Sequence, residues 1–163
     1  MIREARIAIS KIDPNAMKVT AAELFFQQGE AYYYHAESLR PRAADIANIW
    51  LWDSEAAKLE RVAVDNGHFA ELMSMRCCEW ALKADETTGK AIALWIAAFF
   101  KAEAAVDEQP DYFDQGHPDA MTYATTAGPE YLHAALDRAL EGKNADVALG
   151  VVEALAANAG EKS

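Results

Sequence analysis

Glu130 and His133 are the residue pair whose types and spacing come closest to known chemistry. They stand three residues apart in a stretch with helical periodicity, so they share one helix face. A Glu-x-x-His pair is half of the two-iron sites that helical bundles build, and a complete site needs a second pair and two further glutamates. The remaining histidines supply no second pair: His35, His68 and His117. We therefore expect no metal here, and Glu130 is explained by the helix dipole in its first turn.

Cys77 and Cys78 are the only thiols, and they are adjacent within an apolar run. A catalytic thiolate needs a base in contact and an electropositive pocket, and the sequence places neither beside them. Neighbouring cysteines are also unsuited to a structural bridge across a loop. We expect buried thiols in a reducing compartment, with no catalytic role.

The segment 107–118 combines acids, prolines and aromatics. Oxygen ligands for a hard cation are available from Asp107, Glu108, Asp111, Asp114 and the following Asp119, but their spacing is not that of a calcium-binding hand. Tyr112 and Phe113 lie between the acids and are expected to anchor the loop in a groove. The sequence contains no phosphate-binding glycine loop, Ser-His-Asp pattern or zinc spacing. We expect no enzyme, no cofactor and no catalytic residue.

The charge balance limits the classes of partner that the protein is expected to bind. The 163 residues contain 26 acidic and 15 basic side chains, a net charge of -11, which is the wrong sign for nucleic acid or anionic lipid. Most of the acidic excess lies in 103–163, so a partner of that part is expected to be basic or neutral. The longest apolar run, 91–100, is too short to span a membrane. With no secretory signal pattern, the chain is expected to be cytoplasmic.

Alanine dominates the composition with 35 residues, and alanine and leucine recur at helical spacing. Thr20 and Glu23 have capping-box spacing at the start of a long helix. Nine helices are expected: 2–12, 20–40, 41–52, 54–65, 68–84, 87–106, 119–126, 129–142 and 145–158. Helices of this length joined by short turns pack antiparallel on their neighbours.

Consecutive aromatics indicate helices that are covered on more than one side. Tyr32, Tyr33 and Tyr34 advance 100° each around a helix, and so do Trp50, Leu51 and Trp52. One buried stripe cannot cover such a set, so these helices are expected in an inner layer of a stack or at the centre of a bundle.

Two segments resemble helical repeats. In GEAYYYHAESLRP, the spacing of Gly29, Tyr33, Ala36 and Pro41 resembles the second helix of a tetratricopeptide repeat. The tail, 128–160, resembles a HEAT-type hairpin, although Ala148 stands where that family usually has arginine and Gly160 comes one residue late. The segments 81–106 and 123–160 also resemble alanine-rich repeat proteins of large bacterial polypeptides. The resemblance implies an all-α fold, a right-handed α-α superhelix (solenoid) of stacked antiparallel hairpins.

The predicted organisation is one helical-repeat domain over 1–163, with TPR-like hairpins over 1–106 and HEAT-like hairpins over 119–163, joined by the loop 107–118. The predicted function is a non-catalytic protein-protein interaction or scaffolding module, expected to belong to a longer protein and to bind a protein or peptide. Two alternatives stay open at this point. One is a helical-bundle metal protein or enzyme that uses Glu130 and His133, and the other is a structural spacer.

Overall fold

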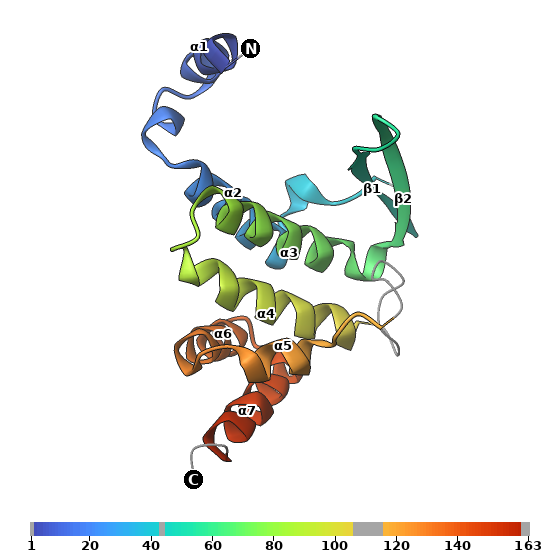
Figure 1. The fold of residues 1–163 in the computed structure, drawn as a ribbon, viewed down its shortest axis with the longest axis vertical. Helices are drawn as coiled ribbons and strands as arrows, with labels where there is room; N and C mark the ends of the chain where they lie inside the picture. Colours follow the sequence, from blue (N-terminus) through green and yellow to red (C-terminus); the bar gives the residue numbers. More distant parts are fainter. Residues whose placement is uncertain (1, 43–44, 106–115, 161–163) are drawn as a thin grey trace.

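The computed structural model describes residues 2–42, 45–105 and 116–160, and it is mostly helical with one small sheet (Figure 1). Its elements follow in chain order: α1 (Ile2–Ile12), a 3-10 turn (Ala16–Lys18), α2 (Ala21–Tyr33), a 3-10 turn η2 (Glu37–Leu39), β1 (Ile46–Asp53), β2 (Lys58–Asp65), α3 (Asn66–Ala84), α4 (Gly89–Ala104), α5 (Ala120–Thr126), α6 (Pro129–Glu141) and α7 (Ala145–Gly160).

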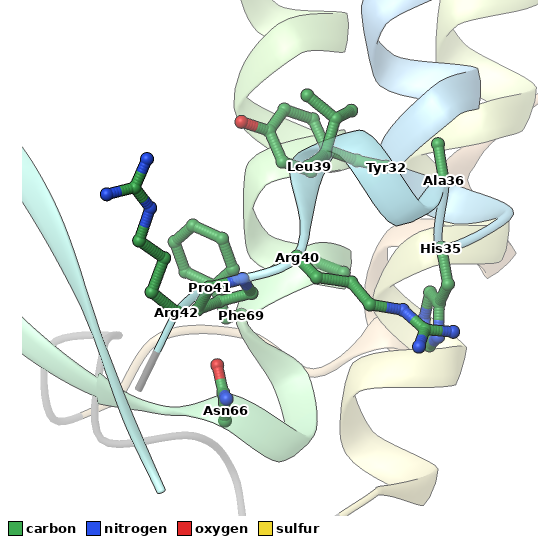
Figure 2. A pocket seen from close by; sticks show the side chains of 10 residues that line it. Tyr32, His35, Ala36, Leu39, Arg40, Pro41, Arg42, Asn66 and Phe69 are labelled. Carbon is green, nitrogen blue, oxygen red and sulfur yellow. The ribbon is translucent and has the colours of Figure 1, made fainter. Parts of the chain in front are cut away.

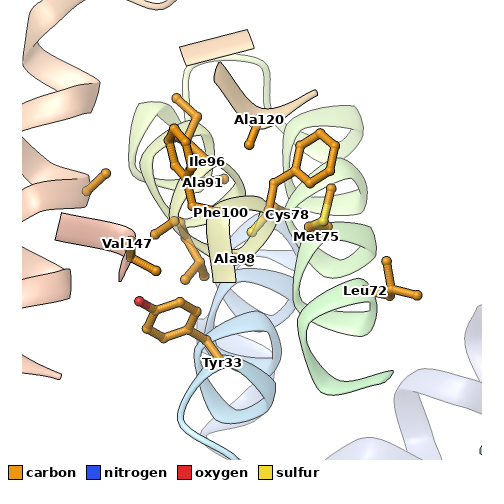
Figure 3. Packing of buried hydrophobic residues seen from close by; sticks show 14 of the residues in the cluster. Tyr33, Leu72, Met75, Cys78, Ala91, Ile96, Ala98, Phe100, Ala120 and Val147 are labelled. Atoms are coloured by element: carbon orange, nitrogen blue, oxygen red, sulfur yellow. The ribbon is translucent and has the colours of Figure 1, made fainter. Parts of the chain in front are cut away.

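Helix α4 is the centre of the helical stack. Helices α2 and α3 pack on one side of it and α5, α6 and α7 on the other, as Figure 1 shows. Its sequence alternates small alanines with large apolar residues, so neighbouring helices can approach closely on every side. Leu94, Ala97 and Phe99 are fully buried, and the ring of Phe100 packs against Gly150 on α7; Figure 3 shows part of this cluster.

Gly29 marks the closest approach between α2 and its neighbours. A Cβ atom at this position would lie 3.3 Å from the Cys77 Cβ and from the backbone oxygen of Ser74 on α3, and 3.3 Å from a methyl of Leu94 on α4. Such contacts are tighter than ordinary van der Waals packing. The glycine is therefore explained by the packing of three helices, whatever the repeat-like spacing around it.

Several expected helix starts are confirmed. The Thr20 hydroxyl accepts a hydrogen bond from the Glu23 backbone N–H at 3.1 Å. Asp119 caps α5 through the Thr122 N–H at 2.8 Å, and Asn144 caps α7 through a bond from the next turn. Glu23 does not complete a capping box in the described contacts, because its carboxylate accepts from Gln27 and pairs with Lys90 on α4.

The expected all-α fold is wrong between residues 46 and 65. Where two helices, 41–52 and 54–65, are predicted, the chain forms an antiparallel hairpin in which Ile46 pairs with Asp65 and Asp53 with Lys58. The turn has no glycine. The Asp53 carboxylate accepts the N–H groups of Glu55 and Ala56, and Ala57 adopts a left-handed φ of 49°.

The hairpin also overturns the predicted superhelix, because a solenoid of stacked helical hairpins has no place for a two-stranded sheet between its second and third helices. The consecutive aromatics of β1 have a different explanation from the expected one. Successive side chains of a strand point to opposite faces, so Leu51 turns inward while Trp50 and Trp52 turn outward.

Helix α2 ends seven residues earlier than predicted, at Tyr33 instead of Arg40. His35 stands just beyond the end with a left-handed φ of 54°. The Ala36 N–H donates to the Ala31 carbonyl and the His35 N–H to the Tyr32 carbonyl, both at 2.9 Å. This is the Schellman arrangement, in which glycine is the usual residue at the position that His35 occupies.

The remaining elements agree with the expected helices to within a few residues, and α6 and α7 form the predicted C-terminal hairpin. Helix α1 stands apart from the stack, and Ile7, Ile9 and Ile12 on it are exposed (Figure 1). Most of the predicted loop 107–118 lies outside the described residues. None of the described helices combines the length and the apolar character that crossing a bilayer requires.

Candidate functional site

A buried carboxylate organises the corner where α2 ends. Glu71 on α3 is 2% exposed, and its Oε1 atom lies 2.6 Å from His35 Nε2 and 3.1 Å from Lys101 Nζ on α4. Lys101 also donates to the Tyr33 backbone carbonyl at 2.7 Å. Within the described part of the chain the second oxygen of Glu71, Oε2, has no hydrogen-bond partner. Three elements far apart in the sequence therefore meet at one buried charge.

The ion pair fixes the imidazole of His35. The 2.6 Å contact between Nε2 and the carboxylate oxygen is a hydrogen bond that shares one proton between the two groups. Lys101 Nζ lies 3.1 Å from the same Nε2. The ring is therefore positioned by two partners on two different helices.

His35 stands at the rim of a cavity of about 400 Å³ on the hairpin side of α2. The cavity lies among η2, the segment after it and the start of α3, and its lining is Tyr32, His35, Ala36, Leu39, Arg40, Pro41, Arg42, Asn66, Phe69 and Ala70. Figure 2 shows the Arg40 side chain extended toward His35 and that of Arg42 extended the opposite way. His35 also lines a smaller cavity of about 220 Å³ on the α4 side.

The outward face of the hairpin is a second feature with recognition chemistry. Trp50 is 55% exposed, Trp52 is 63% exposed, and Leu59, paired with Trp52, is 61% exposed. The inward face buries Ala47 and Ile49 against the core. The hairpin is thus held by one face and presents large apolar side chains to solvent on the other.

The outer edge of β2 has backbone groups available for pairing. The Asn66 N–H donates to the Asp45 carbonyl at 3.1 Å, and bonded and non-bonded pairs alternate along an antiparallel ladder. The alternation directs the backbone groups of Leu59, Arg61 and Ala63 away from β1. The described residues form a sheet of two strands, so no third strand lies along this edge. The β1 edge differs, because Arg76 on α3 donates to the Trp50 carbonyl at 3.1 Å.

Glu130 and His133, the pair singled out by spacing, lie on the exposed surface of α6. The Glu130 carboxylate folds back over Gly128 at the helix start, in agreement with a role at the helix dipole. Among the described residues no three His, Cys, Asp or Glu side chains gather in a way that could hold a metal ion. The acids of 107–114 lie outside the described residues, and Asp119 caps a helix.

Cys77 and Cys78 are free and buried within α3, as expected. Burial raises the pKa of Cys77 to about 11, and the pKa of Cys78 is raised further. Both thiols are therefore protonated and unreactive at neutral pH. His68, the nearest histidine to these cysteines in the sequence, is buried near the start of α3.

Comparisons with known protein families, curated proteins and solved structures give no match. Sequence reasoning missed His35, Glu71 and Lys101, because they are 36 and 30 residues apart and only the tertiary fold brings them together. The one available signal was a buried-helix glutamate: Glu71 falls on the side of α3 that carries Leu72, Met75 and Cys78.

Proposed function

We propose that this protein is a non-catalytic protein-binding module, and that its hairpin binds an extended, basic segment of a partner protein. The exposed tryptophan pair Trp50 and Trp52 is the observation that carries the proposal. Tryptophan is enriched among the residues that dominate binding energy at interfaces, and a pair beside Leu59 supplies a continuous apolar patch.

The shape of the hairpin favours an extended partner segment. A peptide that adds along the outer edge of β2 would gain backbone hydrogen bonds from the positions of Leu59, Arg61 and Ala63. Its alternate side chains would then lie on the same face as the tryptophans. A partner helix would cover the apolar patch but would leave these backbone groups unused.

Charge favours a basic segment. Within residues 45–65 the acidic residues outnumber the basic ones, Lys58 and Arg61, and one further basic residue, Arg76 on α3, reaches the β1 edge; the acidic residues are Asp45, Asp53, Glu55, Glu60 and Asp65. The whole chain carries a net charge of -11 in the same sense. Long-range attraction therefore steers basic segments toward the protein and repels acidic ones, and added salt weakens this effect.

Selection from displayed peptide libraries tests the proposal. The peptides match the hairpin strands in length, 8 residues, with apolar positions alternating with Lys or Arg in one library and with Asp or Glu in the other. We expect enrichment from the basic library only. The double substitution Trp50→Thr/Trp52→Thr, which keeps β-forming residues, should weaken a selected peptide at least about tenfold in titration calorimetry.

Leu149→Ala is the matched control, because Leu149 is 61% exposed on α7, far from the hairpin. It should leave the affinity unchanged. N-methylation of alternate peptide amides should abolish binding if the peptide pairs with β2. Equal enrichment from both libraries, or equal affinity for the double variant, would overturn the proposal.

A further inference from the structure

The cavity beside His35 has a charge opposite to that of the protein. Its lining contains Arg40, Arg42 and the His35 imidazole, and none of the ten described residues that line it is acidic. The protein as a whole has 26 acidic residues and 15 basic ones. A cationic recess in such an acidic protein differs from its overall charge and needs its own explanation.

We propose that this cavity binds a small organic carboxylate with a flat apolar body. Arg40 and Arg42 both line the recess, with their side chains extended in opposite directions in Figure 2, and one guanidinium group binds a carboxylate through paired N–H donors. The apolar part of the lining comes from Tyr32, Leu39 and Phe69. A volume of about 400 Å³ is within the range of small-molecule sites.

The surrounding charges leave the recess positive. Glu71 is the acid nearest to His35, and its charge is balanced by Lys101 at 3.1 Å. Glu37 and Asp45 are exposed and do not line the cavity, and Asp65 caps α3 by accepting the Gly67 N–H at 2.6 Å. The two arginines therefore have no carboxylate of the described chain as a partner within the recess.

His35 makes the site more than a chance depression. A left-handed residue at this helix end is normally glycine, and a non-glycine residue there carries a backbone strain of roughly 1 kcal/mol. The side chain offsets that strain through its 2.6 Å contact with the buried Glu71. The result is a fixed polar ring at the rim, facing the side from which Arg40 approaches (Figure 2). A ring that is already held in place loses less entropy when a ligand contacts it.

Titration calorimetry with naphthalene-2-carboxylate tests the site, and naphthalene-2-carboxamide serves as the neutral match of the same shape. We expect the carboxylate to bind at least about tenfold more tightly than the amide. Arg40→Gln should remove at least about tenfold of the carboxylate affinity and leave the amide affinity unchanged, because only the charged contact is lost.

Arg3→Gln, at an exposed position on α1, is the matched control and should leave carboxylate binding unchanged. Equal affinity for acid and amide, or full affinity in Arg40→Gln, would overturn the proposal. Tighter binding of 2-naphthyl phosphate than of the carboxylate would overturn the choice of carboxylate. The outcome is independent of peptide binding at the hairpin, because Trp50→Thr/Trp52→Thr should retain carboxylate affinity.

Discussion

Helix α4 and the β-hairpin place similar side chains in opposite environments. Phe99 is fully buried between helices on both sides, whereas Trp50 and Trp52, of comparable apolar area, are more than half exposed. The folding free energy is therefore concentrated in the helical stack. Apolar area removed from water stabilises the helical stack, and the outer face of the hairpin contributes little to it. That face is consequently free to serve recognition.

The corner around Glu71 connects these two regions. Lys101 belongs to α4, Glu71 to α3 and His35 to the segment that leads to the hairpin. The buried carboxylate therefore ties the wall of the cationic cavity to α3 and α4, which carry much of the buried core. A site held in this way keeps its shape without a ligand.

Substitutions in the two regions should differ most clearly in how much they change the free energy of unfolding. Phe99→Ala should lower the free energy of unfolding by about 3–5 kcal/mol, because it removes a fully buried ring and leaves a cavity between α4 and its neighbours. Trp52→Thr should change it by less than about 0.5 kcal/mol, since most of that side chain is already in water. Urea unfolding followed by circular dichroism measures both.

A loss of more than about 2 kcal/mol in Trp52→Thr would contradict the comparison, because it would mean that the outer face of the hairpin supports the fold. Trp95→Phe can serve as the intermediate case: Trp95 is half-buried on α4 and contacts the rings of Phe99 and Tyr123.

The next largest effect is expected at the corner. Lys101→Met should cost about 3 kcal/mol in urea unfolding, because it leaves Glu71 buried with only His35 as a partner. It also removes the cation that lies 4.7 Å above the Tyr33 ring. The same variant should weaken naphthalene-2-carboxylate binding, since the charge of Glu71 is then unbalanced next to the cavity.

The double variant Glu71→Leu/Lys101→Met distinguishes an ion pair from a packing role. Replacing a whole buried pair with apolar residues of similar size is commonly close to neutral, so the double variant should recover most of the stability that Lys101→Met loses. If the double variant is less stable than the single one by the full cost of a second core substitution, the two residues act independently.

Much of the helical part of the fold could be predicted from the sequence. Alanine-rich periodicity located α3, α4, α6 and α7 to within a few residues, and Asp119 and Asn144 identified two helix starts. These features are local, because capping and periodicity depend on residues within one or two turns. The early end of α2 is different. It depends on His35 in a left-handed conformation, which is stabilised by the distant Glu71.

The hairpin could not be predicted in the same way. Both faces of β1 carry apolar residues, so the alternation typical of a half-buried strand is hidden, and the turn lacks the expected glycine. Trp50-Leu51-Trp52 fits a helix covered on several sides as well as a strand that carries apolar side chains on both faces. The candidate site was hidden for a further reason: its residues come from α3, α4 and the end of α2, and no spacing in the chain relates them.

The smallest expected effect concerns Glu103, on the α4 side of the comparison. Burial raises the pKa of this carboxyl above its ordinary value of 4.5, and the Ala120 N–H that it accepts at 3.0 Å opposes the shift only in part. The folded protein therefore binds this proton more tightly than the unfolded chain. The stabilising contribution of protonation is complete below pH 4.5 and is lost as the pH rises through the raised pKa.

Glu103→Gln keeps an acceptor for Ala120 without the charge, so at pH 7 it should raise the free energy of unfolding by no more than about 1 kcal/mol. The gain should shrink to nothing near pH 4. The difference between variant and wild type is the informative quantity, since Glu23 and Asp119, whose pKa values are lowered by their hydrogen bonds, destabilise both proteins alike in acid. Glu153→Gln, on the exposed side of α7, is the control and should show no such trend. A gain that stays constant from pH 7 to pH 4 would mean that Glu103 acts through packing and not through its buried charge.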